Sequence, residues 1–188
     1  MTGPDGGSGF RHLGDDLVFA GHAISLNQSR FVSPDGSEFT REIVRHPGAV
    51  CVVPFHDDGT VTLVKQYRAP LDTLMIEIPA GKRDVEGEPP EITARRELAE
   101  EVGLVPGTLE LLVHYHNSVG FTDEESFVYL ATDLESVPAE PQGIEEENME
   151  VLRIPLGEAV ALIGTGGITD GKTVIGLTFT QQRTQSDR

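Results

Sequence analysis

Short runs of alternating or clustered apolar residues, typical of β-strands, recur along the chain. The turn residues Pro34-Asp35-Gly36 separate two such runs and predict a hairpin, and His56-Asp57-Asp58-Gly59 predicts a second one. Runs of this kind predict strands at residues 16–21, 23–32, 38–46, 49–55, 61–67, 75–78, 109–116, 126–133 and 151–154.

Helical patterns are fewer and lie in the middle and at the end of the chain. Pro89 or Pro90 fits the first turn of a helix, where the missing N–H costs no hydrogen bond, and Gly103 suits its C-terminal cap. Two further helices are expected at residues 157–163 and at about 170–183. Strands, a central helix, more strands and then helices predict an α+β fold, an α/β/α sandwich.

Composition divides the chain into one domain with short ends. The 188 residues are enough for a single core, with a Gly-rich disordered tail expected at 1–14 and a second tail at 184–188. Between them, residues 15–47 are N-terminal strands and residues 48–183 form the main domain. No apolar run approaches the roughly 20 residues of a membrane helix, and MTGPDGGSGF lacks the features of a secretory signal.

Charge and cysteine content narrow the function classes. A net charge of −17 argues against a nucleic-acid partner, because phosphate binding needs a basic surface. Cys51 is the single cysteine, which is compatible with a reducing cytoplasm and makes a zinc site a poor hypothesis. We therefore expect a cytoplasmic protein without a nucleic-acid or membrane partner.

The central predicted helix carries an unusual group of carboxylates. Residues at i, i+3 and i+4 share a helix face, so Glu97, Glu100 and Glu101 project together. Three like charges repel one another at this range unless a cation lies among them, and carboxylate oxygens are the ligands that Mg²⁺ prefers. Arg96 is one turn before Glu100 and suits an ion pair with it. The alternative is a solvated face on which Arg95 and Arg96 neutralise the glutamates.

The full pattern around this helix resembles the Nudix box. That motif is Gly, five residues, Glu, seven residues, Arg-Glu, an aliphatic residue, any residue, Glu-Glu, any residue, Gly and an aliphatic residue. The sequence matches every specified position from Glu88 to Leu104. It departs from the motif only where six residues instead of five separate Gly81 from Glu88, in a loop that tolerates insertion.

The resemblance implies a fold, a cofactor and several roles. The fold is a Nudix-type α/β/α sandwich with an N-terminal antiparallel strand extension. The cofactor is Mg²⁺, for which Mn²⁺ can substitute, held by Glu97, Glu100, Glu101 and the carbonyl of Ala80. Arg96 orients a glutamate, and Arg96 and Glu100 count among the catalytic residues. The reaction is attack of a positioned water on a diphosphate.

Three short segments resemble the ADP-ribose pyrophosphatase branch of this family. They are Glu77-Ile-Pro-Ala-Gly81, Gln66-Tyr67-Arg68 and Thr40-Arg41-Glu42-Ile43-Val44. The resemblance assigns substrate contacts to Arg41, Arg68 and Glu77, and implies a homodimer that exchanges its N-terminal strands. In that dimer Arg41 reaches the partner's site. The alternatives are arginines on the surface at strand ends and, for Glu77, a polar strand residue that faces no ligand.

A second acidic run, Gln142-Gly-Ile-Glu145-Glu146-Glu147-Asn148, precedes the last predicted strand. By resemblance this loop supplies the general base, with Glu147 the first choice and Glu146 the second. Met149 stands where some relatives have a further metal-binding glutamate. Without the resemblance, such a run reads as solvated surface.

The turn Ser118-Val119-Gly120 bears on the substrate. ADP-ribose pyrophosphatases typically have Pro where Val119 stands, and we assign Gly120 to substrate binding. The expected substrate is a nucleoside diphosphate sugar, first ADP-ribose, which would give AMP and ribose 5-phosphate. Alternatives are GDP-mannose or a UDP-sugar, and a non-catalytic module that only binds a nucleotide sugar.

Overall fold

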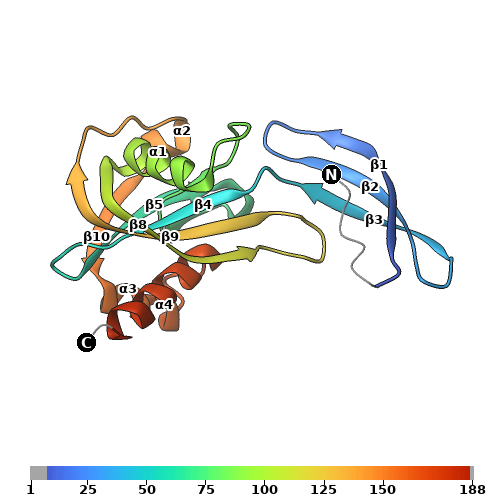
Figure 1. Cartoon of the computed structure of the whole chain (residues 1–188). Helices are drawn as coiled ribbons and strands as arrows, with labels where there is room; N and C mark the ends of the chain where they lie inside the picture. Colours follow the sequence, from blue (N-terminus) through green and yellow to red (C-terminus); the bar gives the residue numbers. More distant parts are fainter. Residues whose placement is uncertain (1–7, 187–188) are drawn as a thin grey trace. The chain divides into compact units, whose positions relative to one another are not determined.

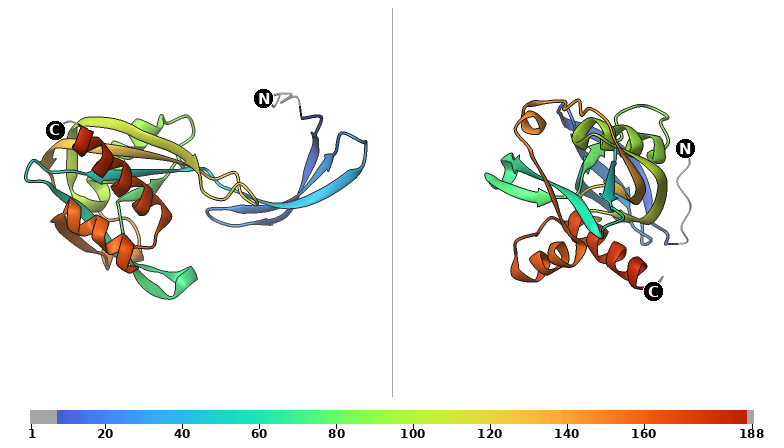
Figure 2. Two further views of the ribbon diagram at one scale, coloured as in Figure 1. Left: turned by 90° about the horizontal axis from the view of Figure 1, so that it is seen from below. Right: turned by 90° about the vertical axis from the view of Figure 1, so that its left-hand side faces the viewer.

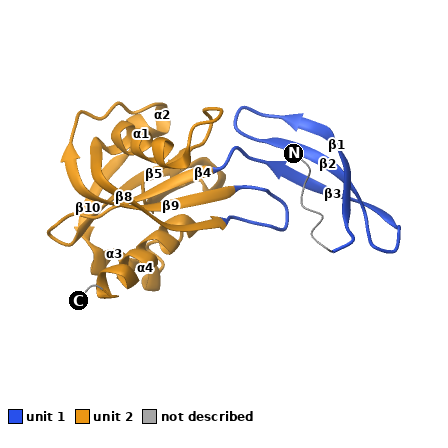
Figure 3. Ribbon diagram, viewed as in Figure 1, with its two compact units in different colours: residues 1–48, 116–124 blue, residues 49–115, 125–188 orange. Residues whose placement is uncertain are grey.

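The computed structural model describes residues 8–186, so 1–7 and 187–188 of the two predicted tails lie outside the described residues. The described chain divides into two compact units (Figures 1 and 3). Unit 1 comprises residues 1–48 and 116–124, and unit 2 comprises 49–115 and 125–188. No helix among the described residues is long and apolar enough to cross a membrane.

Unit 1 is built on an antiparallel sheet in the order β1-β2-β3, with β1 at Arg11–Ala20, β2 at Ser25–Val32 and β3 at Glu38–Arg45. The predicted turn joins β2 to β3, with Gly36 at φ 88°, a backbone conformation that glycine adopts readily. The stacked rings of Phe31 and Phe39, with centroids 5.4 Å apart, form a cross-strand pair that supports this register.

The predicted N-terminal tail is too long. Residues 11–14 belong to β1, where Arg11 pairs with Val32 and His12 with Phe31. A register shift between His12 and Gly14, with Gly14 at φ 151°, lets a glycine-rich segment stay in the sheet. Gly14, one of the glycines that indicate a tail in the sequence, therefore serves a bulge.

Unit 2 contains two sheets. One has the order β10-β5-β6, with β5 at Thr60–Arg68, β6 at Thr73–Glu77 and β10 at Glu150–Pro155. The other has the order β7-β4-β9-β8. Its strands are β4 at Ala49–Pro54, β7 at Ala80–Lys82, β8 at Leu104–His116 and β9 at Glu125–Ser136. A short 3₁₀ helix at Ala69–Leu71 connects β5 to β6.

Helices cover both faces of the β4–β9 region (Figures 1 and 2). Val50 and Val52 of β4 pack with Ala94 and Leu98 of α1, which spans Pro90–Val102. The alternate residues Cys51 and Val53 lie in the core shared with the other helices. Those helices are α3 at Leu156–Thr165 and α4 at Gly171–Ser186. A buried strand with helices on both sides confirms the predicted α/β/α architecture.

Helix ends follow the capping residues of the sequence, with two differences. Pro90 begins α1 and Gly103 caps it at φ 65°, as predicted. A four-residue helix, α2 at Ile144–Glu147, was not predicted and lies in the second acidic run. The predicted C-terminal tail is too long, because α4 continues through residues 184–186. There the Thr184 and Ser186 hydroxyls bond to carbonyls one turn earlier.

Candidate active site

Arg96 bonds to two glutamates of α1, Glu97 and Glu100, and to Glu88. Its guanidinium donates to Glu97 at 2.8 Å, to Glu100 at 3.0 Å and to Glu88 at 3.2 Å. The ion pair with Glu100 is the one that the helical spacing predicts. The structure therefore brings three glutamates of the motif together around one arginine.

Glu97 lies directly against the backbone of β7. A Cβ atom at Gly81 would stand 2.0 Å from the Glu97 carboxyl carbon, so any other residue at position 81 would force the Glu97 side chain to move. Burial raises the pKa of Glu97 despite its contact with Arg96. Gly81 thus allows a loop backbone and a carboxylate to approach each other closely.

Glu101 is a buried carboxylate, only 4% exposed. Its one described hydrogen bond comes from the Ala80 N–H at 3.0 Å. Burial raises its pKa to about 8, against the opposing effect of this hydrogen bond, and the negative charges of Glu146 and Glu97 raise it further. The charge of Arg68 opposes this rise, and a further cation nearby would favour the ionised form of Glu101.

The two candidate bases differ in their surroundings. Glu146 is partly buried, accepts a hydrogen bond from the Gln142 N–H at 2.6 Å and acts electrostatically on Glu101. Glu147 is exposed on the same short helix, and its charge is not among the main causes of the Glu101 pKa shift. The structure thus associates the second choice, Glu146, with the carboxylates of α1, while the role of Glu147 stays a prediction.

Arg68 and Glu77 contact each other. The Arg68 guanidinium donates to both carboxylate oxygens of Glu77, at 2.7 and 2.5 Å, and Lys172 donates to the same carboxylate. Burial alone would raise the pKa of Glu77, which is 1% exposed, but the two cations outweigh burial and lower it. Glu77 therefore has its carboxylate occupied within the protein, while Arg68 keeps a partly exposed side.

Arg41 and Gly120, the two remaining candidates, belong to unit 1. Arg41 lies over the Phe39 ring at 4.8 Å and donates to the Thr40 carbonyl at 2.7 Å. Gly120 is in an exposed turn closed by Phe121 N–H, which donates to the Ser118 carbonyl at 3.1 Å. Their roles toward substrate stay predictions.

Comparison with known proteins tests the resemblance. A family model described as the NUDIX domain matches residues 44–174, more than half of the chain. The chain belongs to the Nudix family. The predicted resemblance is thereby confirmed, and the protein is assigned to the Nudix hydrolases on the family match and its relatives together.

The relatives of this Nudix protein cover nearly all of it. An ADP-ribose pyrophosphatase of Bacillus subtilis is 37% identical over 169 residues, 90% of this chain and 91% of the relative. An ADP-ribose pyrophosphatase of Mycobacterium tuberculosis is 38% identical over 168 residues, which cover 89% of this chain and 81% of the relative. A methanol dehydrogenase activator of Bacillus methanolicus is 38% identical over 166 residues, 88% and 89%. More distant relatives are named GDP-mannose pyrophosphatase.

A solved structure gives the same fold. The crystal structure of an ADP compounds hydrolase matches with a TM-score of 0.80, covering 95% of each chain at 21% identity. This likeness supports the Nudix-type sandwich.

The Nudix carboxylates have the chemistry of a site for a hard divalent cation. Among residues 8–186, no three His, Cys, Asp or Glu side chains are arranged to hold a metal directly. In this arrangement Arg96 holds Glu97 and Glu100, and the Ala80 N–H holds Glu101. The donor set nevertheless fits the cation, because Glu101 is buried beside other carboxylates that raise its pKa.

Sequence reasoning missed Lys172 and Thr173, in the first turn of helix α4, and Asp170, which immediately precedes that helix. Lys172 Nζ bonds to Glu77 and lies 3.0 Å from Asp170. Lys172 and Glu77 are 95 positions apart in the Nudix chain, and no local spacing signals their contact. Only the packing of α4 shows it.

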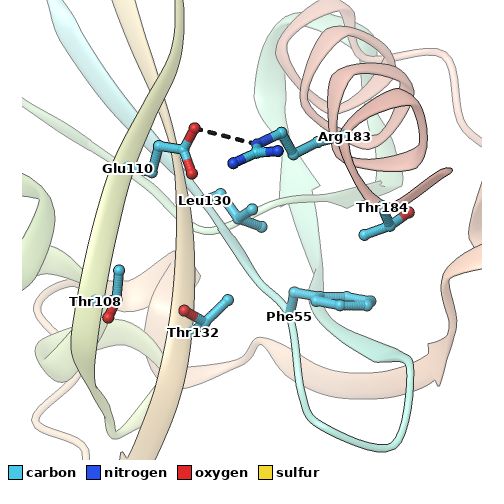
Figure 4. A pocket seen from close by; sticks show the side chains of 7 residues that line it. All are labelled: Phe55, Thr108, Glu110, Leu130, Thr132, Arg183 and Thr184. Carbon is cyan, nitrogen blue, oxygen red and sulfur yellow. Dashed lines mark hydrogen bonds and ion pairs between the residues drawn. The ribbon is translucent and has the colours of Figure 1, made fainter. Parts of the chain in front are cut away.

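A separate cavity of about 200 Å³ lies elsewhere in unit 2 (Figure 4). The Arg183 guanidinium donates to Glu110 at 3.3 Å across it, and Phe55 and Leu130 supply apolar walls. None of the predicted Nudix site residues lines this cavity.

Proposed function

We propose that this Nudix protein hydrolyses the diphosphate bond of ADP-ribose and releases AMP and ribose 5-phosphate. The observation that carries a hydrolytic role is the buried Glu101 carboxylate beside Glu97 and Glu146. The substrate follows from the two relatives of 37–38% identity that are named ADP-ribose pyrophosphatase.

The proposed cofactor is Mg²⁺, which Mn²⁺ can replace. Glu97, Glu100, Glu101 and the carbonyl of Ala80 would hold it once Glu97 and Glu100 turn away from Arg96. A bound divalent cation neutralises charge on the diphosphate oxygens during attack. Arg96 reaches Glu88, Glu97 and Glu100, so it would orient any of these glutamates that does not bind the cation.

We assign the general base to Glu146. A carboxylate there accepts a proton from the attacking water while the water oxygen bonds to a diphosphate phosphorus and the bridging P–O bond breaks. The bridging oxygen departs with the other phosphate group. Arg68, held by Glu77 on one side and partly exposed on the other, is oriented to donate to a phosphate oxygen.

A hexose nucleotide is the second candidate substrate. Val119 is 81% exposed and stands where the resemblance expects Pro, so the turn before Gly120 lacks the fixed φ of proline. We expect a weaker preference for ADP-ribose over GDP-mannose or a UDP-sugar, and ADP-ribose still preferred.

The direct test is product analysis of ADP-ribose incubated with the protein. With Mg²⁺ or Mn²⁺ present, we expect AMP and ribose 5-phosphate in equal amounts, with one ¹⁸O incorporated from labelled water. With chelator present, we expect neither product. Full activity in chelator contradicts the metal site, and the absence of AMP with either metal contradicts the activity.

We also propose that the chain forms a homodimer through unit 1. Strand β1 presents Leu17, Val18 and Phe19, all well exposed, and each β1 residue has a hydrogen-bonded strand on only one side. Light scattering at micromolar concentration should give twice the chain mass, and Arg41→Ala should lower kcat/KM without changing that mass. A fully active monomer would refute the proposal.

The proposed compartment is the cytoplasm. Cys51 is buried in the core of unit 2. It is the single cysteine, so no disulfide within the chain is possible. Fractionation of cells that express the tagged chain should place it with cytoplasmic markers, and its recovery with another compartment would refute this.

A further inference from the structure

The chain changes sheets immediately before the Nudix box. Strand β6 ends at Glu77 in one sheet, and β7 begins at Ala80 in the other. Ile78, between them, is fully buried, so its N–H needs a hydrogen-bond partner outside both sheets.

Thr173, in the first turn of α4, supplies that partner. Its Oγ1 accepts a hydrogen bond from the Ile78 N–H at 2.9 Å and donates one to Asp170 Oδ2 at 2.6 Å. The same Asp170 oxygen accepts the Thr173 N–H at 3.0 Å, which caps the helix. The fully buried Thr173 hydroxyl thereby both accepts and donates a hydrogen bond.

Close packing of α4 makes this contact possible. A Cβ atom at Gly176, one turn after Thr173, would lie 2.9 Å from Val53 and 3.0 Å from Ile78 side-chain atoms. The missing side chain therefore lets the helix approach β4 and the Ile78 segment. Lys172 adds a second connection through its bond to Glu77.

The same backbone segment meets the carboxylates two residues later. Ala80 N–H donates to Glu101 at 3.0 Å, and Gly81 accommodates Glu97. The Pro79 carbonyl, between these contacts, accepts the Val52 N–H at 2.9 Å. The segment from Ile78 to Gly81 therefore contacts two of the three glutamates of the motif, and the Thr173 bond lies at its start.

We propose that Thr173 is a positioning residue, which fixes the backbone from Ile78 to Gly81 and so sets the geometry of the metal-binding carboxylates. This inference rests on the proposed function. Residues that orient metal ligands without touching the metal typically contribute 10–100-fold to affinity. Thr173 belongs to α4, which lies outside the motif, and it acts on the metal-binding glutamates through the Ile78 backbone.

The test is Mn²⁺ affinity of the full-length protein, measured from the electron paramagnetic resonance signal of free Mn²⁺. Thr173→Val keeps the side-chain shape and removes the hydroxyl, and it should weaken Mn²⁺ binding at least about tenfold. Thr173→Ser keeps both hydrogen bonds and should restore binding to within about twofold of wild type. In metal-free Thr173→Val, the Ile78 amide should exchange faster with solvent.

Thr180 gives a matched control on the same helix. It is equally buried, and its Oγ1 has no hydrogen-bond partner in the described structure. Thr180→Val should therefore leave Mn²⁺ affinity unchanged. If Thr173→Val does not fold, Thr173→Ala, which removes the same hydroxyl from a smaller side chain, takes its place.

The outcomes separate this inference from the proposed function. If the wild-type protein and Thr173→Val bind Mn²⁺ equally well, that result overturns the positioning role of Thr173 and leaves the proposed function standing. Equal weakening by Thr173→Ser or Thr180→Val also overturns it, because the effect would not depend on the hydroxyl. Wild-type protein that binds no Mn²⁺ overturns the proposed function and the inference with it.

Discussion

Glu100→Gln and Glu101→Gln are each expected to lower kcat by about a hundredfold or more, because a divalent cation supplies several kcal/mol of charge stabilisation in the transition state. Glu100 accepts a hydrogen bond from Arg96 of the same helix, and Glu101 accepts one from the Ala80 N–H. The measurement is ADP-ribose turnover at saturating Mg²⁺, with Mn²⁺ affinity determined in parallel.

Glu91→Gln is the matched control, since Glu91 is an exposed glutamate of α1 that pairs with Arg95. It should retain wild-type turnover. Near-normal turnover in both Glu100→Gln and Glu101→Gln would contradict the metal site, as would an equal loss in Glu91→Gln.

Glu101→Gln should also change how the stability of the metal-free protein depends on pH. The pKa of Glu101 in the folded protein, about 8, is above the ordinary glutamate value of 4.5, because burial opposes its ionisation. In metal-free protein, stability is therefore lost as pH rises from about 4.5 to about 8, by roughly 1.4 kcal/mol for each step of one in pH. Glu101→Gln removes this loss. Its Tm should fall less than that of wild type between pH 5 and pH 9.

The second large effect concerns the base. Glu146→Gln is expected to lower kcat about 10²–10⁴-fold with little change in KM, because a general base acts mainly in the transition state. We choose Glu146 because it is partly buried and its charge is one of those that raise the pKa of Glu101.

The neighbouring Glu147 provides the comparison, because it has the same charge on the same short helix and is exposed. Glu147→Gln should leave kcat within a few-fold of wild type. If instead Glu147→Gln is inactive and Glu146→Gln is near normal, the base is the residue that the sequence alone ranks first.

Local sequence signals predicted the parts of the fold that local physics decides. The Val-rich run at residues 49–55 predicted β4, and the Pro90 and Gly103 caps bound α1. The motif likewise predicted the ion pair of Arg96 with Glu100, because it depends on helical spacing alone.

Contacts between distant segments were not predictable in this way. The ion pair of Glu77 with Lys172 and the bond from Ile78 to Thr173 each join positions 95 apart. Nothing in the alternation of β6 shows that the Glu77 carboxylate contacts both Arg68 and Lys172. Composition also misled at Gly14, where a glycine in a bulge has the same local signature as one in a tail.

Substrate preference tests the central claim most directly. The measurement is kcat/KM for ADP-ribose, GDP-mannose and UDP-glucose with Mg²⁺, on one preparation of the full chain. We predict that ADP-ribose has the highest value. The exposed Val119 in place of Pro narrows the margin by about tenfold, or 1.4 kcal/mol, which is too little to invert a strong preference. A hexose nucleotide that exceeds ADP-ribose by far more than tenfold would contradict the assigned substrate.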